Sequence, residues 1–410
     1  MITEPAAGMI EAERRSMFRS REFAFVLLAY FFAFFSVSLF YLFPLFLDRF
    51  HPSKIRVGLI MGIQSVTAIL VRPLFGRFLD EQGGRRAALA SILFMIAVIS
   101  GFHLVRSAGI LVILLRALNG AGWGIAATAI LAICSDLAPA NRMAHSLGVV
   151  GIAGIIAEAV GPTVAEEMSR RVGFGGVFNL SLVLLAAAFL CVAAIRQPRP
   201  RGDAREVERM PSLANYRLPI LVVMASMPIV HGAVRGTIIN FIALFGTSAG
   251  FNRVGPFFLA FSTAAILMRL ALGDLSDRYG RKRVISPAAV LIGLNLFWIA
   301  GVRSYAAYLI GGFAAGLGQG LMFPALSTYV IDLLGRGKKG LALGIYLSLV
   351  DVGTGLGSPF FGWISDRTGY RGMYAIAGCL ILLFTALFHA KAPAASSRGA
   401  ANPETPESLK

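Results

Sequence analysis

A small group of charged side chains lies within long, otherwise apolar stretches of this sequence. Of the 21 acidic residues only two lie deep in these stretches, Glu158 and Asp351, together with the basic residues Arg72, Arg116, His231, Arg235 and Arg269. If these stretches cross a membrane, each buried charge is costly and is a functional candidate. Arginine stays charged at any relevant pH, so only a carboxylate or the His231 imidazole can carry a proton. Glu158 and Asp351 are therefore the first proton-coupling candidates, and His231 is the third.

A buried carboxylate that exchanges partners can bind and release a proton. Burial raises the pKa of a carboxyl group, whereas a neighbouring arginine lowers it. A carboxylate that loses its arginine partner during a conformational change would thus take up a proton in one state and release it in the other. Sodium coupling has less support, because no cluster of acidic and carbonyl ligands accompanies these residues.

The composition shows what kind of chain must position these charges. Of its 410 residues 57% are hydrophobic and 14% charged, against about 25% charged in soluble domains. The mean hydropathy is +0.73. This composition excludes a water-soluble enzyme and a disordered chain. The three cysteines are far apart, so neither a disulfide framework nor a metal site is indicated. The sequence predicts an integral membrane protein.

The apolar stretches predict an all-α protein with twelve transmembrane helices, because about 20 apolar residues span a bilayer and helix satisfies the backbone there. The predicted spans are 23–47, 55–77, 87–105, 109–134, 145–166, 176–195, 218–246, 255–275, 284–302, 305–332, 341–363 and 373–390. Of 38 Lys and Arg residues, 24 fall on the side of the termini, 10 on the opposite side and 4 deep within spans, with residues at span ends counted with the adjoining side. The positive-inside rule therefore predicts that both termini are cytoplasmic.

The two halves of the chain repeat each other. An arginine, a glycine and an aspartate at four-residue intervals occur twice, 197 residues apart: Arg72, Gly76 and Asp80, then Arg269, Gly273 and Asp277. A run of alternating glycines recurs at a shift of 196: Gly120, Gly122 and Gly124, then Gly316, Gly318 and Gly320. Such matches predict two parallel six-helix repeats, an arrangement known in transporters. We expect a cytoplasmic N-terminus at 1–22, bundles at 23–195 and 218–390, a linker at 196–217 and a tail at 391–410.

These motifs resemble those of the major facilitator superfamily. Residues 76–86, with Gly76, Asp80 and Arg85, are similar to the signature loop of that family. The copy at 273–283 fits it more closely and contains Gly273, Asp277, Arg278, Gly280 and Arg281. The resemblance implies the major facilitator fold, with these loops forming gate-stabilising ion pairs. Arg116 with Gly120 and Gly122 is similar to the fourth-helix motif of proton-coupled members, and Gly161-Pro162 to a motif of exporters.

The resemblance also places the buried charges. In the family's fold, helices one, four, seven and ten line a central cavity, which implies four cavity candidates: Arg116, His231, Arg235 and Asn240. Aromatic residues on the same helices suit an amphipathic ligand: Tyr30, Phe34, Tyr41, Phe241, Phe323 and Tyr329. Helices two and eleven, and five and eight, meet between the halves in that fold. We therefore expect Asp351 to contact Arg72 and Glu158 to contact Arg269. Glycines at four-residue spacing, including Gly120 and Gly161, are expected to let helices pack closely.

These features favour a secondary transporter that works by alternating access and exports a small organic solute in exchange for protons, similar to the drug-efflux branch of the family. One alternative is a proton-coupled organic-anion symporter, since the deep arginines outnumber the deep carboxylates and arginine binds carboxylates bidentately. Another is a transporter-like membrane receptor. An enzyme is not expected, because no catalytic constellation gathers in one place.

The expected surroundings follow from the same features. The partners are a small-molecule substrate, protons and the lipid bilayer. The basic residues lack the interleaved aromatics of a nucleic-acid surface, so no nucleic acid is expected. No cofactor and no metal are expected, and a monomer suffices, because two halves surround one site. The short loops favour a multi-pass protein of the bacterial inner membrane.

Overall fold

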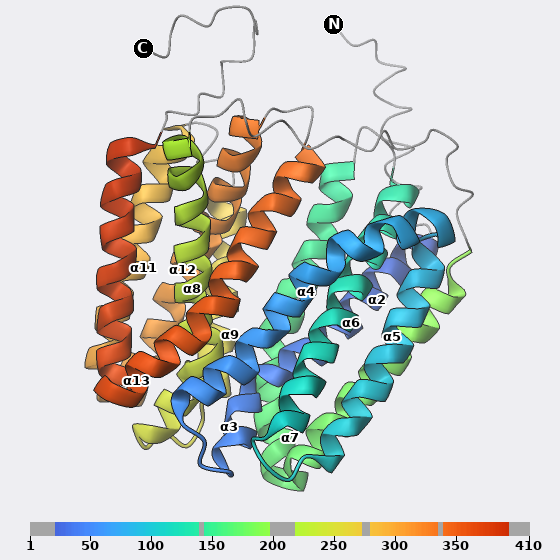
Figure 1. Ribbon diagram of the computed structural model, residues 1–410, viewed down its shortest axis with the longest axis horizontal. Coiled ribbons are helices and arrows are strands. Elements are labelled where there is room, and N and C mark those ends of the chain that lie inside the picture. Colours follow the sequence, from blue (N-terminus) through green and yellow to red (C-terminus); the bar gives the residue numbers. More distant parts are fainter. Residues whose placement is uncertain (1–20, 139–142, 197–217, 273–278, 335–338, 393–410) are drawn as a thin grey trace, which may run out of the picture.

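The computed structural model describes residues 21–138, 143–196, 218–272, 279–334 and 339–392. Every regular element within these ranges is helical (Figure 1). Nine helical segments among the described residues are long and apolar enough to cross a membrane, and a shorter apolar helix spans Gly255–Ala271. Helix is the state expected of such runs, because hydrocarbon offers no other partner for the backbone groups.

The elements follow one another in chain order with short connections. They are α2 (Arg21–Leu39), η1 (Phe40–Leu42), α3 (Phe43–Asp48), α4 (Lys54–Gln82), α5 (Gly84–Gly101), η2 (Phe102–Leu104), α6 (Ile110–Leu137), α7 (Met143–Ala194), α8 (Leu218–Ser248), α9 (Gly255–Leu272), α11 (Arg281–Gly301), α12 (Tyr305–Leu334) and α13 (Lys339–Lys391).

The two longest helices turn sharply at a glycine. Helix α7 has 52 residues and turns at Gly173 (φ 76°, ψ 178°), and α13 has 53 residues and turns at Gly369 (φ 73°, ψ 175°). Only glycine adopts this conformation without strain. Each long helix therefore contains two arms, and each arm holds one of the spans predicted from the sequence (Figure 1).

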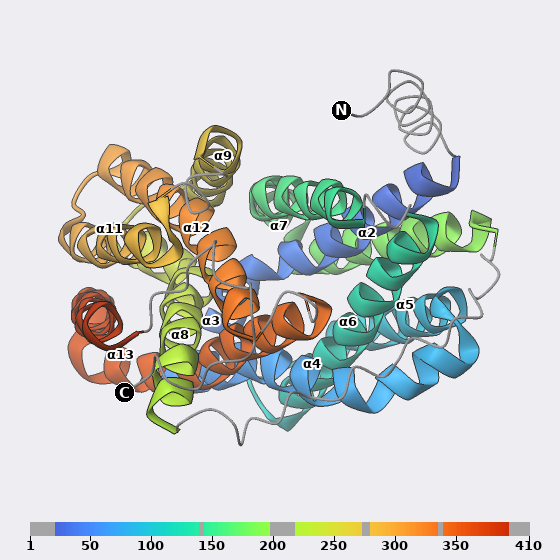
Figure 2. The ribbon, with the colours of Figure 1, turned by 90° about the horizontal axis from the view of Figure 1, so that it is seen from above.

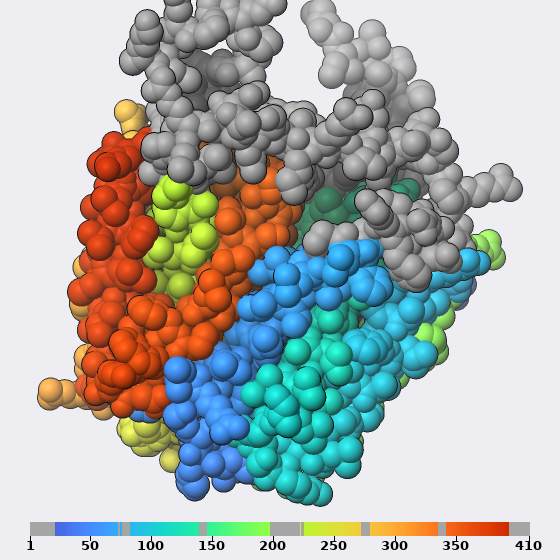
Figure 3. Space-filling model, viewed as in Figure 1, coloured from blue at the N-terminus to red at the C-terminus, as the bar shows by residue number. Residues whose placement is uncertain are grey.

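The helices pack as two groups. Helices α2 to α7 contact mainly one another, and so do α8 to α13. We call these groups the N-terminal bundle and the C-terminal bundle; viewed from above they lie side by side (Figure 2). The main contacts between them are α4 with α13 and α7 with α9. The first of these contacts is visible as a diagonal seam on the molecular surface (Figure 3).

Both contacts between the bundles are held by carboxylates at one end of the molecule. We call this end, which includes the turns at Gly173 and Gly369 and the loop 249–254, the Gly173 end. Asp366 on α13 accepts the backbone N–H groups of Lys54 (2.7 Å) and Ile55 (2.9 Å) at the start of α4. Helix N-termini have unsatisfied N–H groups and a partial positive charge, so a carboxylate there is stabilising.

The second contact has the same construction with the bundles exchanged. Glu166 on α7 accepts the N–H groups of Val254 (2.8 Å) and Gly255 (2.9 Å) at the start of α9. Each bundle thus contributes one carboxylate that caps a helix of the other bundle. Close backbone contact accompanies the α4–α13 cap, since a Cβ atom at Gly58 would collide with the Ser358 carbonyl.

Candidate functional site

An ion pair joins the two bundles in the middle of the molecule. The Glu158 carboxylate on α7 lies 2.9 Å from Nη2 of Arg235 on α8. Its Oε1 atom also accepts a hydrogen bond from the Tyr41 hydroxyl of η1 (3.2 Å). The side chains of Arg235 and Glu158 are 24% and 11% exposed, so the pair is largely removed from solvent. A charged pair in such surroundings is held by its mutual contact, and the loss of either partner is costly.

The expected contact between Glu158 and Arg269 is wrong, because Glu158 pairs with Arg235. Arg269 lies three residues before the end of α9, whereas Glu158 lies midway along the first arm of α7. The Arg269 guanidinium instead stacks over the Phe323 ring, 5.0 Å from its centroid. A helix rises 1.5 Å per residue, so residues on facing helices meet only when their depths match. The family resemblance identified the facing helices but not these depths.

The other expected contact between the bundles is present. Nη1 of Arg72 on α4 lies 2.7 Å from Oδ2 of Asp351 on α13, and each side chain is 28% exposed. The structure therefore brings each deep carboxylate to an arginine of the opposite bundle. A movement of one bundle against the other would therefore separate each carboxylate from its arginine.

His231 is hydrogen-bonded to the side-chain amide of Gln319, a residue that was not among the predicted site residues. Its Nε2 atom lies 2.7 Å from Oε1 of Gln319 on α12, and its Nδ1 atom has no hydrogen-bond partner among the described residues. The side chain is 1% exposed. Gln319 lies in the second glycine run, where the first repeat has Trp123. An uncharged amide within an apolar span was the signal that could have identified it.

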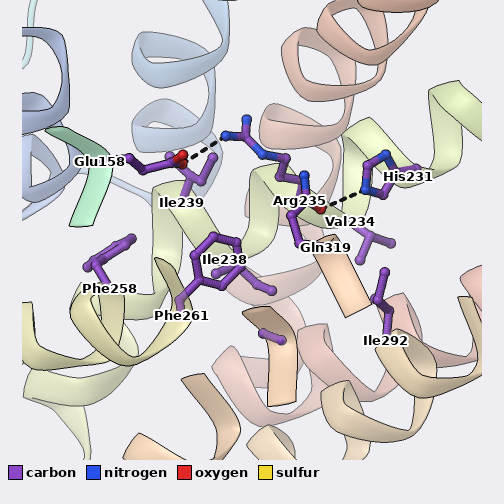
Figure 4. A pocket seen from close by; sticks show the side chains of 11 residues that line it. Glu158, His231, Val234, Arg235, Ile238, Ile239, Phe258, Phe261, Ile292 and Gln319 are labelled. Carbon is purple, nitrogen blue, oxygen red and sulfur yellow. Dashed lines mark hydrogen bonds and ion pairs between the residues drawn. The ribbon is translucent and has the colours of Figure 1, made fainter. Parts of the chain in front are cut away.

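The side chains of these polar groups line a small pocket (Figure 4). Its polar lining is Glu158, His231, Arg235 and Gln319, and its apolar lining is Val234, Ile238, Ile239, Phe258, Phe261, Ile292 and Ala315. The pocket therefore contains one carboxylate and one guanidinium, which are paired, beside an imidazole–amide pair. The N-terminal bundle contributes Glu158, and all the other residues of this lining belong to the C-terminal bundle. Mostly apolar walls with a few convergent polar groups are the kind of lining found in sites for small organic ligands. The cavity has a volume of about 20 Å³, so an organic ligand fits only when the walls move apart.

Arg116 lies away from this pocket. Its side chain is 2% exposed and its guanidinium stacks against the rings of Phe40 (5.6 Å) and Phe43 (5.3 Å). Nε lies 3.4 Å from the Ile60 carbonyl, and Nη1 has no partner among the described residues. The structure thus separates Arg116 from Arg235, with which the sequence grouped it.

Asn240 is also outside the pocket lining. It is buried on the side of α8 that faces α13, where its Nδ2 donates to the Ser358 hydroxyl (2.7 Å). Its amide stabilises helix packing within the C-terminal bundle. The expected aromatics likewise divide: Tyr41 contacts Glu158, whereas Phe241 and Tyr329 are fully buried in the core.

The signature loops lie only partly within the described residues. Gly273, Asp277 and Arg278 are outside them, and Gly76 and Asp80 lie in α4 without described side chains. Among the loop residues that are described, Arg85 donates to the Ala193 carbonyl (2.7 Å). Gly280 precedes α11 with φ 89°, and Arg281 contacts Asp332 (2.9 Å).

The glycines of the fourth- and fifth-helix motifs serve helix packing. A Cβ atom at Gly120 would collide with the Gln64 carbonyl of α4, and one at Gly122 would lie 2.6 Å from Met95 of α5. A Cβ atom at Gly161 would collide with Ser38 of α2, and Pro162 follows within α7. None of these residues belongs to the lining of the pocket described above. No cluster of metal-ligating side chains was found in the described ranges.

The comparisons with known proteins cover most of the chain. The family model of the Major Facilitator Superfamily matches residues 26–268 and 229–410. The chain is 26% identical over 360 residues to an uncharacterized MFS-type transporter of Salmonella typhimurium, covering 84% of this chain and 90% of the relative. It is 22% identical over 364 residues to the staphylopine export protein of Staphylococcus aureus, covering 82% of this chain and 87% of that protein.

A solved structure has the same fold. The nucleoside transporter NupG aligns with a TM-score of 0.76 at 13% identity, covering 90% of this chain and 99% of NupG. The family and these relatives are transporters, so the expectation that the protein is not an enzyme is confirmed. With a family model matched over nearly its whole length and an all-helical, multi-pass structure, the chain is a member of the major facilitator superfamily of membrane transporters.

Proposed function

We propose that this protein is a secondary active transporter that exports a small organic solute in exchange for protons. The observation that carries the proposal is the Glu158–Arg235 ion pair, which lines a pocket and joins the two bundles. Alternating access moves one bundle against the other around a site near the bilayer midplane. The pair lies where such a movement breaks and remakes contacts, so substrate binding and protonation act on the same group.

The proposed architecture is twelve spans in two parallel repeats, with bundles at 23–195 and 218–390. Its support comes from glycines that have the same backbone conformation at the repeat interval. Gly173 and Gly369, 196 residues apart, turn the two long helices with φ 76° and 73°. Gly83 and Gly280, 197 residues apart, precede α5 and α11 with φ 80° and 89°.

The proposed orientation places both termini in the cytoplasm of a bacterial inner membrane, with the Gly173 end facing outward. It rests on the excess of Lys and Arg on the terminal side and on the bacterial relatives. In that orientation the reciprocal caps of Glu166 and Asp366 close the external side. Release of substrate to the outside then requires both caps to open.

Proton exchange follows from competition for Glu158. When protonated, Glu158 no longer attracts Arg235 or a cationic group of the substrate. A proton that enters from outside would therefore expel the substrate, and loss of the proton to the cytoplasm would restore the site. The export direction is supported by the similarity to the staphylopine export protein.

The alternative is a symporter of organic anions. An anion that binds Arg235 would displace Glu158, and the freed carboxylate would then favour a proton. Anion and proton would bind together, whereas in the exporter substrate and proton exclude each other. The sign of the pH effect on substrate affinity distinguishes these two mechanisms.

A conformational measurement tests the proposal without a known substrate. Spin labels at Ser107 and Ser304, one in each bundle at the Gly173 end, would be attached in a background with the three cysteines (Cys134, Cys191 and Cys379) replaced by serine. We expect the inter-label distance distribution to change with pH in the parent protein. We expect Glu158→Gln to abolish that response. An unchanged pH response in Glu158→Gln, in Asp351→Asn and in the double variant would overturn proton coupling through these carboxylates.

A further inference from the structure

The charge inventory of the pocket constrains its substrate. Glu158 and Arg235 neutralise each other, and His231 is engaged with Gln319. The carboxylate and guanidinium groups of the pocket lining therefore comprise one negative and one positive side chain. A ligand that enters between them must compensate both charges, because a buried charge left without its partner is strongly destabilising.

Three kinds of ligand can be compared on this basis. A monocation would satisfy Glu158 and leave Arg235 without a carboxylate. A monoanion would satisfy Arg235 and leave Glu158 without a cation. A zwitterion satisfies both, since its amine replaces Arg235 at Glu158 and its carboxylate replaces Glu158 at Arg235. The close contact of the pair, 2.9 Å, favours a ligand whose two charges are also close together.

The remaining walls indicate what the rest of the ligand contains. Phe258 and Phe261, one helical turn apart on α9, contribute aromatic surface to the pocket (Figure 4). Aromatic side chains favour apolar or aromatic groups placed against their faces or edges. His231 offers an unpartnered Nδ1 atom in the same lining, which can engage a further polar group of the ligand.

On the basis of the transport function proposed above, we propose that the substrate is a zwitterion with an amine and a carboxylate on the same or neighbouring carbon atoms and an apolar, aromatic body. Arg235 binds the carboxylate, since a guanidinium presents several N–H donors to it. Glu158 binds the amine and is also the group that a proton would occupy. Protonation of Glu158 thus leaves the ligand's amine without a partner, although Arg235 still binds the ligand's carboxylate. The affinity for the zwitterion falls, and the zwitterion leaves the pocket.

A matched set of three ligands tests the substrate class. Phenylalanine is the zwitterion, its methyl ester the monocation and N-acetylphenylalanine the monoanion, and all share one aromatic body. Binding to the detergent-purified full chain would be measured by calorimetry, at a pH at which the ester amine is charged. We expect phenylalanine to bind at least about tenfold more tightly than either derivative, a difference of about 1.4 kcal/mol.

Charge-neutralising variants should reverse this order. In Glu158→Gln the unpaired Arg235 should favour N-acetylphenylalanine, and in Arg235→Gln the unpaired Glu158 should favour the methyl ester. If Glu158 and Arg235 had a purely structural role, each substitution would lower the affinity for all three ligands alike. Glu167→Gln is the matched control: it removes an exposed carboxylate of the same helix and should keep the parent order. If a variant does not fold, the order measured in the parent protein still decides.

Two results would overturn the inference. One is binding of the ester or the acetylated ligand as tight as that of phenylalanine. The other is the absence of binding by all three at millimolar concentration. Neither affects the spin-label experiment, which tests proton coupling without a ligand. The proposed transport function and the proposed substrate class can therefore fail separately.

Discussion

Asp366 on α13 accepts the backbone N–H of Lys54 on α4 at 2.7 Å, so a carboxylate of the C-terminal bundle caps a helix of the N-terminal bundle. Glu166 makes the reciprocal contact with Gly255 at 2.9 Å. The two caps are part of the polar closure at the Gly173 end, beside the hydrogen bonds of Arg170 to the Asn252 carbonyl (3.1 Å) and of Lys54 Nζ to the Ser365 carbonyl (3.0 Å). Because they join different bundles, they contribute to the free-energy difference between the closed and the open conformation of that end.

Removal of either cap should favour the open Gly173 end. A lost N-cap costs about 1 kcal/mol, which corresponds to a change of about fivefold in a conformational equilibrium. We expect Asp366→Ala and Glu166→Ala each to enrich the longer distances between spin labels at Ser107 and Ser304. The double variant should show the larger shift.

The neighbouring Glu167 provides the control for the caps. Its carboxylate pairs with Arg171 on the same helix at 2.5 Å, and this hydrogen bond lowers the pKa of Glu167. Glu167 is therefore a carboxylate on the same helix whose hydrogen bond does not join the bundles. A shift in Glu167→Ala equal to that in Glu166→Ala would show that surface charge, rather than capping, controls the distance.

A side chain at Gly58 should separate α4 from α13. A Cβ atom there would collide with the backbone carbonyl of Ser358, which cannot move aside as a flexible side chain can. We expect Gly58→Ala to lower the melting temperature and to favour the open Gly173 end. Gly148→Ala is the control, because no atom lies within 4 Å of its Cβ position. In a helix, alanine is favoured over glycine by about 0.5–1 kcal/mol, so this variant should be as stable as the parent or more stable.

Arg116 and Arg235 should differ in their effect on ligand selectivity. Arg235 lines the pocket, whereas Arg116 contacts Phe40, Phe43 and Ile60 outside that lining. We expect Arg116→Gln to keep the order of affinity among phenylalanine, its methyl ester and N-acetylphenylalanine, as measured by calorimetry. A reversed order in Arg116→Gln would show that its guanidinium reaches the ligand in another conformation.

The Arg72–Asp351 ion pair should appear as a coupling energy between the bundles. Each side chain is 28% exposed, so removal of one partner leaves the other charge partly buried. Residues in direct contact show coupling energies of about 0.5–3 kcal/mol. We expect the double variant Arg72→Gln/Asp351→Asn to be less destabilised in unfolding experiments than the sum of the single variants. Strict additivity would mean that the contact contributes nothing to stability.

The sequence by itself determined the class of protein and its candidate charges. Long apolar runs permit only helix in hydrocarbon, and repeated glycine motifs identified the family resemblance. Glu158, Arg235 and His231 were found because charged groups are rare within apolar runs. The contact of Arg72 with Asp351 followed from the facing helices of the family fold.

The tertiary structure alone decided which of these groups meet. Glu158 pairs with Arg235 rather than Arg269, Arg116 lies outside the pocket, and Gln319 enters it, because helix depth, rotation and tilt determine each contact. These quantities depend on packing summed over many weak contacts, and motif spacing does not contain them. The reciprocal caps were hidden for the same reason, since Asp366 and Lys54 lie 312 residues apart in sequence and meet only when the two bundles close at the Gly173 end.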